Sequence, residues 1–288
     1  MTRIIIGILS FLPLSVHHAI GSLVGTMLFR FDNRTRRITN TNLTLCFPDL
    51  TQQEHNSLLK LTLKENAKTL IESFWLWKHP KLSIQKCLGK IENKHLLDRA
   101  NGNTKGTIFV TPHFGSWEFI GLLTASQSDL LILYAPPKSE LIEALSCQGR
   151  SGTGGKVIST ESLNLKSLIR HLKSGGSVGI LPDQVPEGNG GEYSPFFGRL
   201  AYTSTLVSKL AIKLQCNIVY CYAIRSTSSD QYNAFYFDAP KEIFSDNILA
   251  SVNSLNKSIE NFVLDCPHQY IWGYKRFKKP APSDSNPY

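Results

Sequence analysis

The stretch that decides the fold reads Gly106-Thr-Ile-Phe-Val-Thr-Pro-His-Phe-Gly-Ser-Trp-Glu118. Its β-branched and aromatic run, ended by Pro112, predicts a buried strand that feeds a loop. The apolar residues from 119 to 123 then predict a helix, for which Ser116 is a good N-cap. His113 falls just after the strand, and Glu118 falls in the first turn of the helix. The stretch therefore predicts a strand–loop–helix unit with two ionisable side chains, His113 and Glu118, between the end of the strand and the first turn of the helix.

The alternation of strands and helices continues on both sides of this stretch. We expect strands at 130–134, 178–181, 218–224 and 234–237, and helices at 58–77, 163–172, 201–214 and 248–264. This order predicts an α/β fold with a mostly parallel central sheet flanked by helices. Ligands in such sheets bind outside the carboxyl ends of the strands. Polar residues follow directly after two of these strands, His113 after the first and Asp183-Gln184 after another.

Composition bounds the classes of protein to which the chain can belong. The 288 residues are 42% hydrophobic, which is enough to bury a core and excludes wholesale disorder. Lys and Arg number 31 against 22 Asp and Glu, so the net charge of +9 favours anionic partners. No helix-turn-helix, RNA-recognition or zinc signature supports a nucleic-acid partner. Six cysteines are too few for a disulfide scaffold and read as buried thiols in a reducing compartment.

The amino-terminal segment predicts an N-terminal membrane helix. No charged residue occurs from Ile4 to Phe29, which is long enough to cross a hydrocarbon layer of ~30 Å. Four arginines at 30, 34, 36 and 37 follow it and, by the positive-inside rule, keep the rest of the chain on the cytoplasmic face. We expect an anchor at 1–30, one catalytic domain at 31–279 and a flexible tail at 280–288. A helix that lies in the bilayer, or a buried helix of a soluble protein, stays open.

The His113–Glu118 pair is the first candidate site. Two residues five apart on one regular helix would lie about 140° apart, but the break at Gly115 lets the two side chains converge. A carboxylate bonded to one imidazole nitrogen fixes the tautomer and supports the cation formed when the other nitrogen takes a proton. This chemistry suits a general base that activates a substrate hydroxyl, although a structural histidine stays an alternative. No His-Glu-x-x-His helix or Gly-x-Ser-x-Gly turn occurs, which argues against a metal site and a serine hydrolase.

The same box resembles the His-x4-Asp/Glu box of the lysophospholipid acyltransferase superfamily. More closely, the chain resembles the bacterial lipid A biosynthesis late acyltransferases, the lauroyl/myristoyl acyltransferase group. Five further segments carry this resemblance, and they lie at 42–50, 148–150, 181–184, 196–203 and 269–278. The closing segment departs from the group, because Pro267-His-Gln-Tyr270 stands where the group often has Pro-Glu-Gln-Tyr. Together the segments extend over nearly the whole chain.

The resemblance implies a glycerolipid-acyltransferase-like fold and transfer of a fatty acyl chain to a hydroxyl of a lipid A precursor. The donor would be an acyl-carrier-protein thioester, or acyl-CoA, with no cofactor and no covalent acyl-enzyme. His113 would act as the base and Glu118 would orient it. The expected substrate-binding residues are Arg150, Asp183, Gln184, Phe197 and Gly198. Arg150 could contact the oxyanion, a phosphate or phosphopantetheine, or could be a plain surface arginine.

The resemblance also implies a cellular setting. The enzyme would act as a monomer at the inner membrane of a Gram-negative cell, with its catalytic domain on the cytoplasmic face. Its partners would be the lipid acceptor, acyl carrier protein and the anionic membrane surface, which a basic cluster at 275–279 could contact. Two alternatives stay open. One is an acyltransferase for another membrane glycolipid or a lysophospholipid, and the other is a non-catalytic, membrane-tethered lipid-binding protein.

Overall fold

The computed structural model describes the chain except for residues 1–6, 8–10, 102–103, 163 and 283. The chain divides into two compact units, each assembled from three separate stretches. Unit 1 comprises residues 1–17, 71–181 and 213–239, and unit 2 comprises residues 18–70, 182–212 and 240–288. The long helix α4 (Gln52–Lys78) contributes its last two turns to unit 1 and the rest to unit 2.

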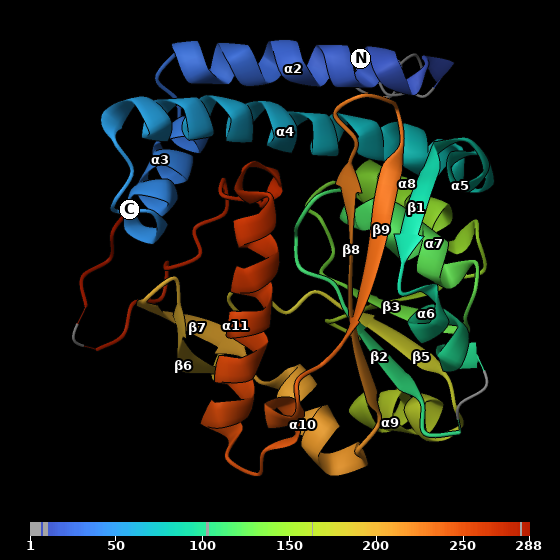
Figure 1. The fold of residues 1–288 in the computed structure, drawn as a ribbon. Coiled ribbons are helices and arrows are strands. Elements are labelled where there is room, and N and C mark those ends of the chain that lie inside the picture. Colours follow the sequence, from blue (N-terminus) through green and yellow to red (C-terminus); the bar gives the residue numbers. More distant parts are fainter. Residues whose placement is uncertain (1–6, 8–10, 102–103, 163, 283) are drawn as a thin grey trace. The chain divides into compact units, whose positions relative to one another are not determined.

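Unit 1 is built on a seven-stranded sheet with the order β1-β9-β8-β2-β5-β3-β4 (Figure 1). Every neighbouring pair is parallel except β8 with β9, so the predicted mostly parallel sheet is confirmed. β2 is buried along its whole length and lies between β8 and β5, which places the start of the His113 loop in the middle of the sheet. The strands are β1 (Leu88–Glu92), β2 (Thr107–Val110), β3 (Leu130–Tyr134), β4 (Lys156–Ser159), β5 (Ser177–Ile180), β8 (Asn217–Arg225) and β9 (Tyr232–Asp238).

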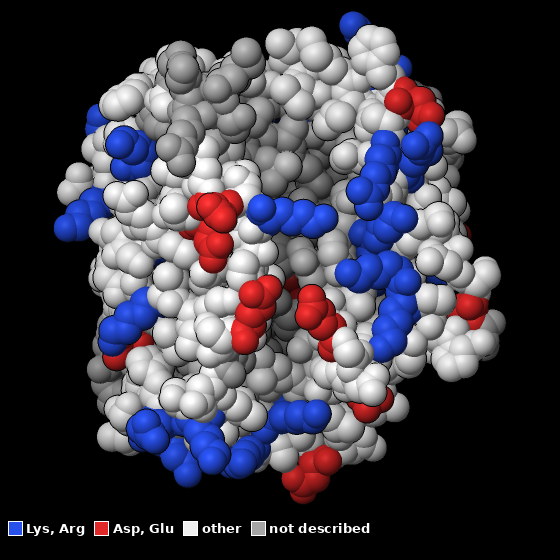
Figure 2. Space-filling view, turned by 180° about the vertical axis from the view of Figure 1, so that it is seen from behind, with Lys and Arg blue, Asp and Glu red and all other residues white. Residues whose placement is uncertain are grey.

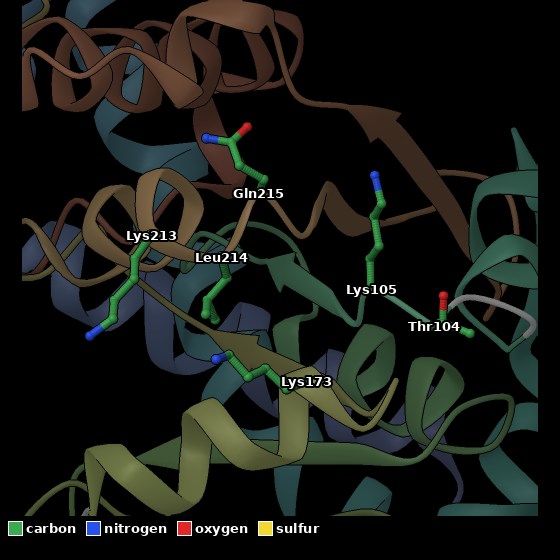
Figure 3. A pocket seen from close by; sticks show the side chains of 6 residues that line it. All are labelled: Thr104, Lys105, Lys173, Lys213, Leu214 and Gln215. Carbon is green, nitrogen blue, oxygen red and sulfur yellow. The ribbon is translucent and has the colours of Figure 1, made fainter.

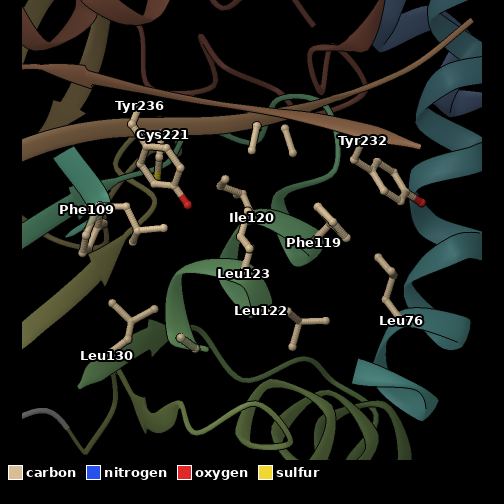
Figure 4. Close-up of a cluster of buried hydrophobic side chains, with 14 of the residues drawn as sticks. Leu76, Phe109, Phe119, Ile120, Leu122, Leu123, Leu130, Cys221, Tyr232 and Tyr236 are labelled. Atoms are coloured by element: carbon tan, nitrogen blue, oxygen red, sulfur yellow. The ribbon is translucent and has the colours of Figure 1, made fainter. Parts of the chain in front are cut away.

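Five of the helices that the structure describes lie wholly within unit 1. They are α5 (Pro80–Cys87), α6 (Lys94–Asn101), α7 (Trp117–Ala125), α8 (Glu140–Ser151) and α9 (Leu165–Lys173). Figure 4 shows α7 directing Ile120 and Leu123 into the cluster that contains Phe109 of β2 and Tyr236 of β9. Burial of each such side chain stabilises the fold by about 1.5–3 kcal/mol. This apolar contact fixes the rotation of α7 about its axis, and therefore the direction of Glu118.

Unit 2 contains a hairpin where the sequence predicted part of a helix. β6 (Gly191–Phe196) pairs antiparallel with β7 (Arg199–Ser204), and α10 (Leu206–Leu214) begins only afterwards, so the expected helix at 201–214 is wrong in its first part. Phe197 and Gly198 form the turn with φ of 49° and 74°, the left-handed values of a type I′ hairpin turn. Tyr193 and Tyr202 pack across the two strands, which favours the strand over the helix.

The remaining helices belong wholly or mainly to unit 2. They are α2 (Leu14–Arg30), α3 (Arg34–Cys46), α11 (Ile248–Asp265) and the short 3-10 turns η1 (Lys241–Phe244) and η2 (Pro267–Gln269). α11 packs on the hairpin, and the Asn256 side chain donates to the Pro195 carbonyl oxygen at 3.0 Å and to the Thr203 hydroxyl at 3.0 Å. These polar contacts fix the helix against both strands.

The membrane-spanning helix expected at the amino terminus is not found. Among the residues that the structure describes, no helix is long and apolar enough to cross a membrane. Residues 1–6 and 8–10 of the expected segment lie outside the described residues. α2 begins directly after Pro13 and has 17 residues; at 1.5 Å per residue it is ~26 Å long, short of the ~30 Å of hydrocarbon. Pro13 accounts for this start, because proline lacks an N–H and disfavours helix at the residue before it.

Two glycines set how α2 packs in unit 2. A Cβ added at Gly21 would lie 2.6 Å from Lys68 Cα, and one at Gly25 would lie 2.3 Å from Lys64 Cα. α2 can therefore approach α4 this closely only with glycine at both positions. Large apolar side chains of α2 point away from this contact and are exposed, namely Leu23, Val24 and Met27.

The carboxyl-terminal residues contact the body of unit 2. The Tyr193 hydroxyl donates to the carbonyl oxygen of Pro280 at 2.8 Å, and Ala281 is buried. The Tyr288 hydroxyl donates to the side-chain oxygen of Asn42 and accepts the Phe277 N–H at 3.1 Å. The segment 280–288 thus contacts unit 2 near both of its ends, and its expected flexibility stays a prediction.

Candidate functional site

The loop between β2 and α7 is held against β8 by its backbone. Gly115 has φ of +61° and forms a bridge with Ala223, and a Cβ added there would lie only 1.9 Å from the Ala223 carbonyl oxygen. The next residue, Ser116, donates its N–H to the same oxygen at 2.8 Å. Only glycine tolerates both this conformation and this approach. The turn that the sequence places between His113 and Glu118 therefore has a fixed path.

His113 lies in this loop with a half-buried imidazole. Its ring centroid is 5.3 Å from that of Trp117, at an interplanar angle of 64°. Burial raises the pKa of Glu118, and Arg150, Trp77 and, least, the electrostatic effect of His113 lower it, so His113 and Glu118 interact electrostatically. The structure thus places the predicted pair in one loop–helix unit, with the histidine partly open to solvent.

Glu118 is buried and accepts three hydrogen bonds. Trp77 Nε1 donates to its Oε2 at 2.8 Å, and Arg150 donates through Nε to Oε2 at 3.0 Å and through a terminal nitrogen to Oε1 at 2.6 Å. Burial by itself raises the pKa of Glu118, but the charge and hydrogen bonds of Arg150, the Trp77 hydrogen bond and the charge of His113 outweigh it. The net pKa lies below the usual value of 4.5, so the carboxylate is ionised at neutral pH.

Arg150 is not a plain surface arginine, because only 20% of its side chain is exposed and it forms a two-point ion pair with Glu118. Burial lowers the pKa of Arg150, and the attraction of Glu118 raises it by more. The guanidinium carbon also lies 5.9 Å from the ring centroid of Tyr134. Its predicted contact with substrate stays a prediction.

Gly149 explains why a Gly-Arg pair stands at this point of α8. A Cβ added at Gly149 would lie 2.4 Å from the Cα of Trp77. The close approach of α8 to the end of α4 brings Arg150 and Trp77 to the same carboxylate. Trp77 was missed from sequence, since it read only as part of an apolar helical stripe at 58–77.

The other predicted site residues belong to unit 2. Asp183 is 1% exposed. Tyr270 is also buried, which is the main reason for its raised pKa, and the charge of Asp183 adds to the effect. Gln184 is half-buried. Both residues directly follow the proline that ends the unit 1 strand, and their predicted contacts with substrate stay predictions.

Phe197 and Gly198 form the turn of the hairpin. The Phe197 N–H donates to Glu260 Oε1 at 2.7 Å, and its ring centroid lies 5.1 Å from that of Phe47 and 5.7 Å from that of Trp272. Three segments that carried the family resemblance therefore meet in one aromatic cluster. This cluster accounts for Phe197 by packing, and a role in binding substrate stays a prediction.

The carboxyl-terminal basic cluster divides into buried and accessible members. Arg276 is buried, and its guanidinium donates to the Tyr202 carbonyl oxygen at 2.9 Å and to the Thr203 hydroxyl at 2.6 Å. Arg276 therefore belongs to the core of unit 2, against the expectation that it forms part of a binding surface. The amino groups of the remaining three, Lys275, Lys278 and Lys279, lie over the rings of Tyr288, Tyr274 and Tyr202.

The part of the chain that the structure describes holds no second cluster of the geometry found around Glu118. A hollow of about 230 Å³ in unit 1 is lined by Thr104, Lys105, Lys173, Lys213, Leu214 and Gln215. Figure 3 shows its three lysine side chains extending in different directions instead of toward one point. Figure 2 shows groups of lysine and arginine side chains on one face, with a few acidic side chains between them. Among the described residues no group of three or more His, Cys, Asp or Glu could hold a metal ion.

Comparison with known proteins identifies relatives along the whole chain. The family model described as bacterial lipid A biosynthesis acyltransferase matches residues 1–279. The chain is 26% identical to the lipid A biosynthesis palmitoleoyltransferase of Escherichia coli (strain K12) over 281 residues, which covers 96% of this chain and 90% of that protein. It is 26% identical to the lauroyltransferase of the same organism over 268 residues, 93% and 87% of the two chains. The myristoyltransferase of that organism is 20% identical over 268 residues, 92% and 82%.

Proposed function

The chain belongs to the bacterial lipid A biosynthesis acyltransferases, and from this premise we propose how it transfers an acyl chain to lipid A. The proposed donor is a fatty acyl thioester of acyl carrier protein, and the acceptor is a hydroxyl of a lipid A precursor. The observation that carries the proposal is a buried, ionised carboxylate, Glu118, fixed by Arg150 and Trp77 in the same unit as a half-buried histidine.

His113 is the proposed general base. It takes the proton of the acceptor hydroxyl while that oxygen attacks the thioester carbonyl carbon. The tetrahedral intermediate then collapses, the carbon–sulfur bond breaks, and the imidazolium returns the proton to the departing thiolate. An ester and a free thiol result, with no change of redox state.

Direct transfer is favoured over a covalent acyl-enzyme. The hydroxyl inside the box belongs to Ser116, which is buried and donates its proton to Glu72 Oε1 at 2.7 Å. A serine nucleophile has to lie beside its base and open to substrate. Ser116 lacks that exposure, so the acceptor hydroxyl itself is the reasonable nucleophile.

Glu118 acts through His113. Its charge stabilises the imidazolium that forms during attack, and its fixed position selects the tautomer of the ring. Arg150 and Trp77 keep this carboxylate ionised and oriented in a buried site, where an isolated charge would otherwise take up a proton. We propose that Arg150 serves this purpose before any contact with substrate.

From unit 2, Asp183, Gln184, Phe197 and Gly198 are proposed to contact the acceptor or to shape its binding site. Gln184 and Gly198 are the more accessible, whereas Asp183 is buried. Variants of Gln184 that raise KM for the lipid with little change in kcat would support acceptor binding.

The proposed location is the cytoplasmic face of the inner membrane, with α2 lying along the interface. The exposed side chains of Leu23 and Met27, with Arg30 at the end of the helix, combine apolar and cationic groups as interfacial helices do. Replacing both Leu23 and Met27 by glutamine should reduce co-sedimentation with phosphatidylglycerol vesicles several-fold. Unchanged binding would argue against this surface.

The function is tested by supplying purified enzyme with lauroyl-, palmitoleoyl- and myristoyl-acyl carrier protein and a lipid A precursor, and measuring the product by mass. His113→Ala should lower the rate at least ~100-fold. His95→Ala, an exposed histidine of α6, is the matched control and should keep full activity. Full activity of His113→Ala would overturn the base mechanism. Acylation of another glycolipid or a lysophospholipid in place of lipid A would overturn the acceptor.

A further inference from the structure

Ser116 occupies the N-cap position of α7 without capping it. In the described structure its hydroxyl accepts no hydrogen bond from the first turn of the helix, although serine at this position ordinarily does so. It instead donates to Glu72 Oε1 at 2.7 Å. The hydroxyl therefore joins the catalytic loop to a different helix, α4.

Glu72 is a fully buried carboxylate, and besides the Ser116 hydroxyl it has a charged partner. Arg225 of β8 donates to the same Oε1 at 2.7 Å, and only 4% of the Arg225 side chain is exposed. A buried ion pair is weak as a source of stability, because well-packed apolar residues often do as well. In some known proteins a buried ion pair instead holds the chain segments around it in one conformation. Here the segments joined by the Glu72–Arg225 pair include the loop at Ser116.

Ser116, the point of contact with α4, lies in sequence between His113 and Glu118. Ser116 is three residues after His113 and two before Glu118, and its backbone is already held by Ala223. α4 also supplies Trp77, which donates to Glu118. One helix thus contacts the loop through Glu72 and the first turn of α7 through Trp77.

We propose that Glu72 is a positioning residue for the reaction. Its hydrogen bond from Ser116, backed by Arg225, sets the distance and angle at which His113 and Glu118 meet. This inference rests on the proposed role of His113 as base. Glu72, which lies far from the His-x4-Glu box in sequence, would thus position both His113 and Glu118.

The decisive variant is Ser116→Ala, which removes the hydroxyl. Because this hydroxyl does not cap α7, the substitution breaks no capping hydrogen bond. We expect kcat to fall about 10- to 100-fold with KM within about 2-fold, since a misplacement near 1 Å costs about 100-fold. Ser126→Ala, at the C-cap of the same helix, is the matched control. Its hydroxyl donates to the Leu123 carbonyl oxygen, and its loss should leave kcat unchanged. Ser116→Thr, which keeps the hydroxyl, should recover most of the activity.

A pH profile separates positioning from mere folding. If Ser116→Ala moves Glu118 away from His113, the imidazolium loses the attraction of the carboxylate. The rising limb of kcat/KM against pH should then move to lower pH in Ser116→Ala and stay in place in Ser126→Ala. Equal thermal unfolding of the two alanine variants would show that both are folded.

The pair Glu72→Gln and Ser116→Ala completes the test as a double-mutant cycle. Because the Ser116 hydroxyl is proposed to act only through Glu72, the double variant should be no slower than Glu72→Gln alone. Additive losses, or a Ser116→Ala enzyme with the kcat and pH profile of wild type, overturn the inference. His113→Ala is measured alongside. If His113→Ala is inactive and Ser116→Ala is unaffected, only the positioning role of Glu72 is refuted. If His113→Ala is fully active, the base mechanism itself is refuted.

Discussion

Unit 1 and unit 2 each bury arginine, but they satisfy it in opposite ways. In unit 1, Arg150 and Arg225 pair with the carboxylates Glu118 and Glu72. The first pair lies at the start of α7, and the second contacts the loop that carries His113 through Ser116. In unit 2, Arg276 donates to neutral oxygens and lies 5.2 Å from the ring centroid of Phe196. In the proposed mechanism the carboxylate pairs place charge beside the base, whereas the neutral partners of Arg276 only join chain segments. Variants in unit 1 should therefore affect rate first, and variants in unit 2 should affect stability first.

The largest effect is expected for Glu118→Gln. The amide keeps the size of the side chain but cannot stabilise an imidazolium by charge, so kcat should fall by about 10²- to 10⁴-fold. The rate is measured under single-turnover conditions with the acyl-carrier-protein thioester. Glu140→Gln, at an exposed position of α8, is the control and should match wild type. A Glu118→Gln enzyme within 2-fold of wild type would remove the distinction between the two units.

In unit 2, Arg276→Met should show the reverse pattern. It removes the Arg276 donor from the Tyr202 carbonyl oxygen and one of two donors from the Thr203 hydroxyl, which Asn256 still reaches, so the free energy of unfolding should fall by about 3 kcal/mol. Urea denaturation measures the loss, and kcat per folded molecule should stay within 2-fold. Lys278→Met, at an exposed position, should change neither quantity. A specific loss of kcat in Arg276→Met with unchanged stability would place chemistry in unit 2.

A steric test compares two glycines of unit 1. Gly149→Ala puts a methyl group 2.4 Å from Trp77 Cα, and it should lower stability by about 1–3 kcal/mol and kcat as well, because Arg150 and Trp77 move together. Gly121→Ala, in the interior of α7, meets nothing within 4 Å and should stabilise by up to about 1 kcal/mol. Both variants are measured by thermal unfolding and by rate. Equal behaviour would mean that α8 does not depend on its close approach to α4.

The smallest effect is the acid dependence of stability. The pKa of Glu118 is below its usual 4.5 in the folded chain, so the unfolded chain takes up a proton first as pH falls. The contribution of this group is fully present above pH 4.5 and is lost as pH falls through the lower folded pKa, at about 1.4 kcal/mol per pKa unit. The stability difference between wild type and Glu118→Gln should therefore shrink between pH 7 and pH 3. A constant difference would contradict the ionised, paired carboxylate.

The interior of the sheet was predictable from sequence. β2, β3 and β5 read as short apolar runs followed by proline, because strands covered on both faces need no polar alternation. The edge strands β1 and β4 were missed, since they are short and half-exposed and carry mixed side chains. The hairpin of unit 2 was partly taken for a helix, because its strands form only through pairing with each other.

The candidate site was predictable only where it is local in sequence. His113, Ser116 and Glu118 lie within one box, and their spacing indicated a loop and a helix start. Trp77 lies 41 positions from Glu118, and Glu72 lies 44 positions from Ser116. Contacts of this kind leave no periodicity, so neither residue could be recognised. For the same reason Arg150 suggested a substrate contact from sequence, whereas its observed partner is Glu118.

The three hydrogen bonds to Glu118 have a consequence for which ring nitrogen of His113 carries the proton. A carboxylate has about four acceptor positions, and among the described residues Trp77 and Arg150 fill three of them. In the proposed dyad the remaining position can take only a donor, so a neutral His113 must turn its N–H inward and its bare nitrogen outward. The indole and the guanidinium thereby decide which nitrogen of a third side chain is basic, although the proposed reaction alters neither of them.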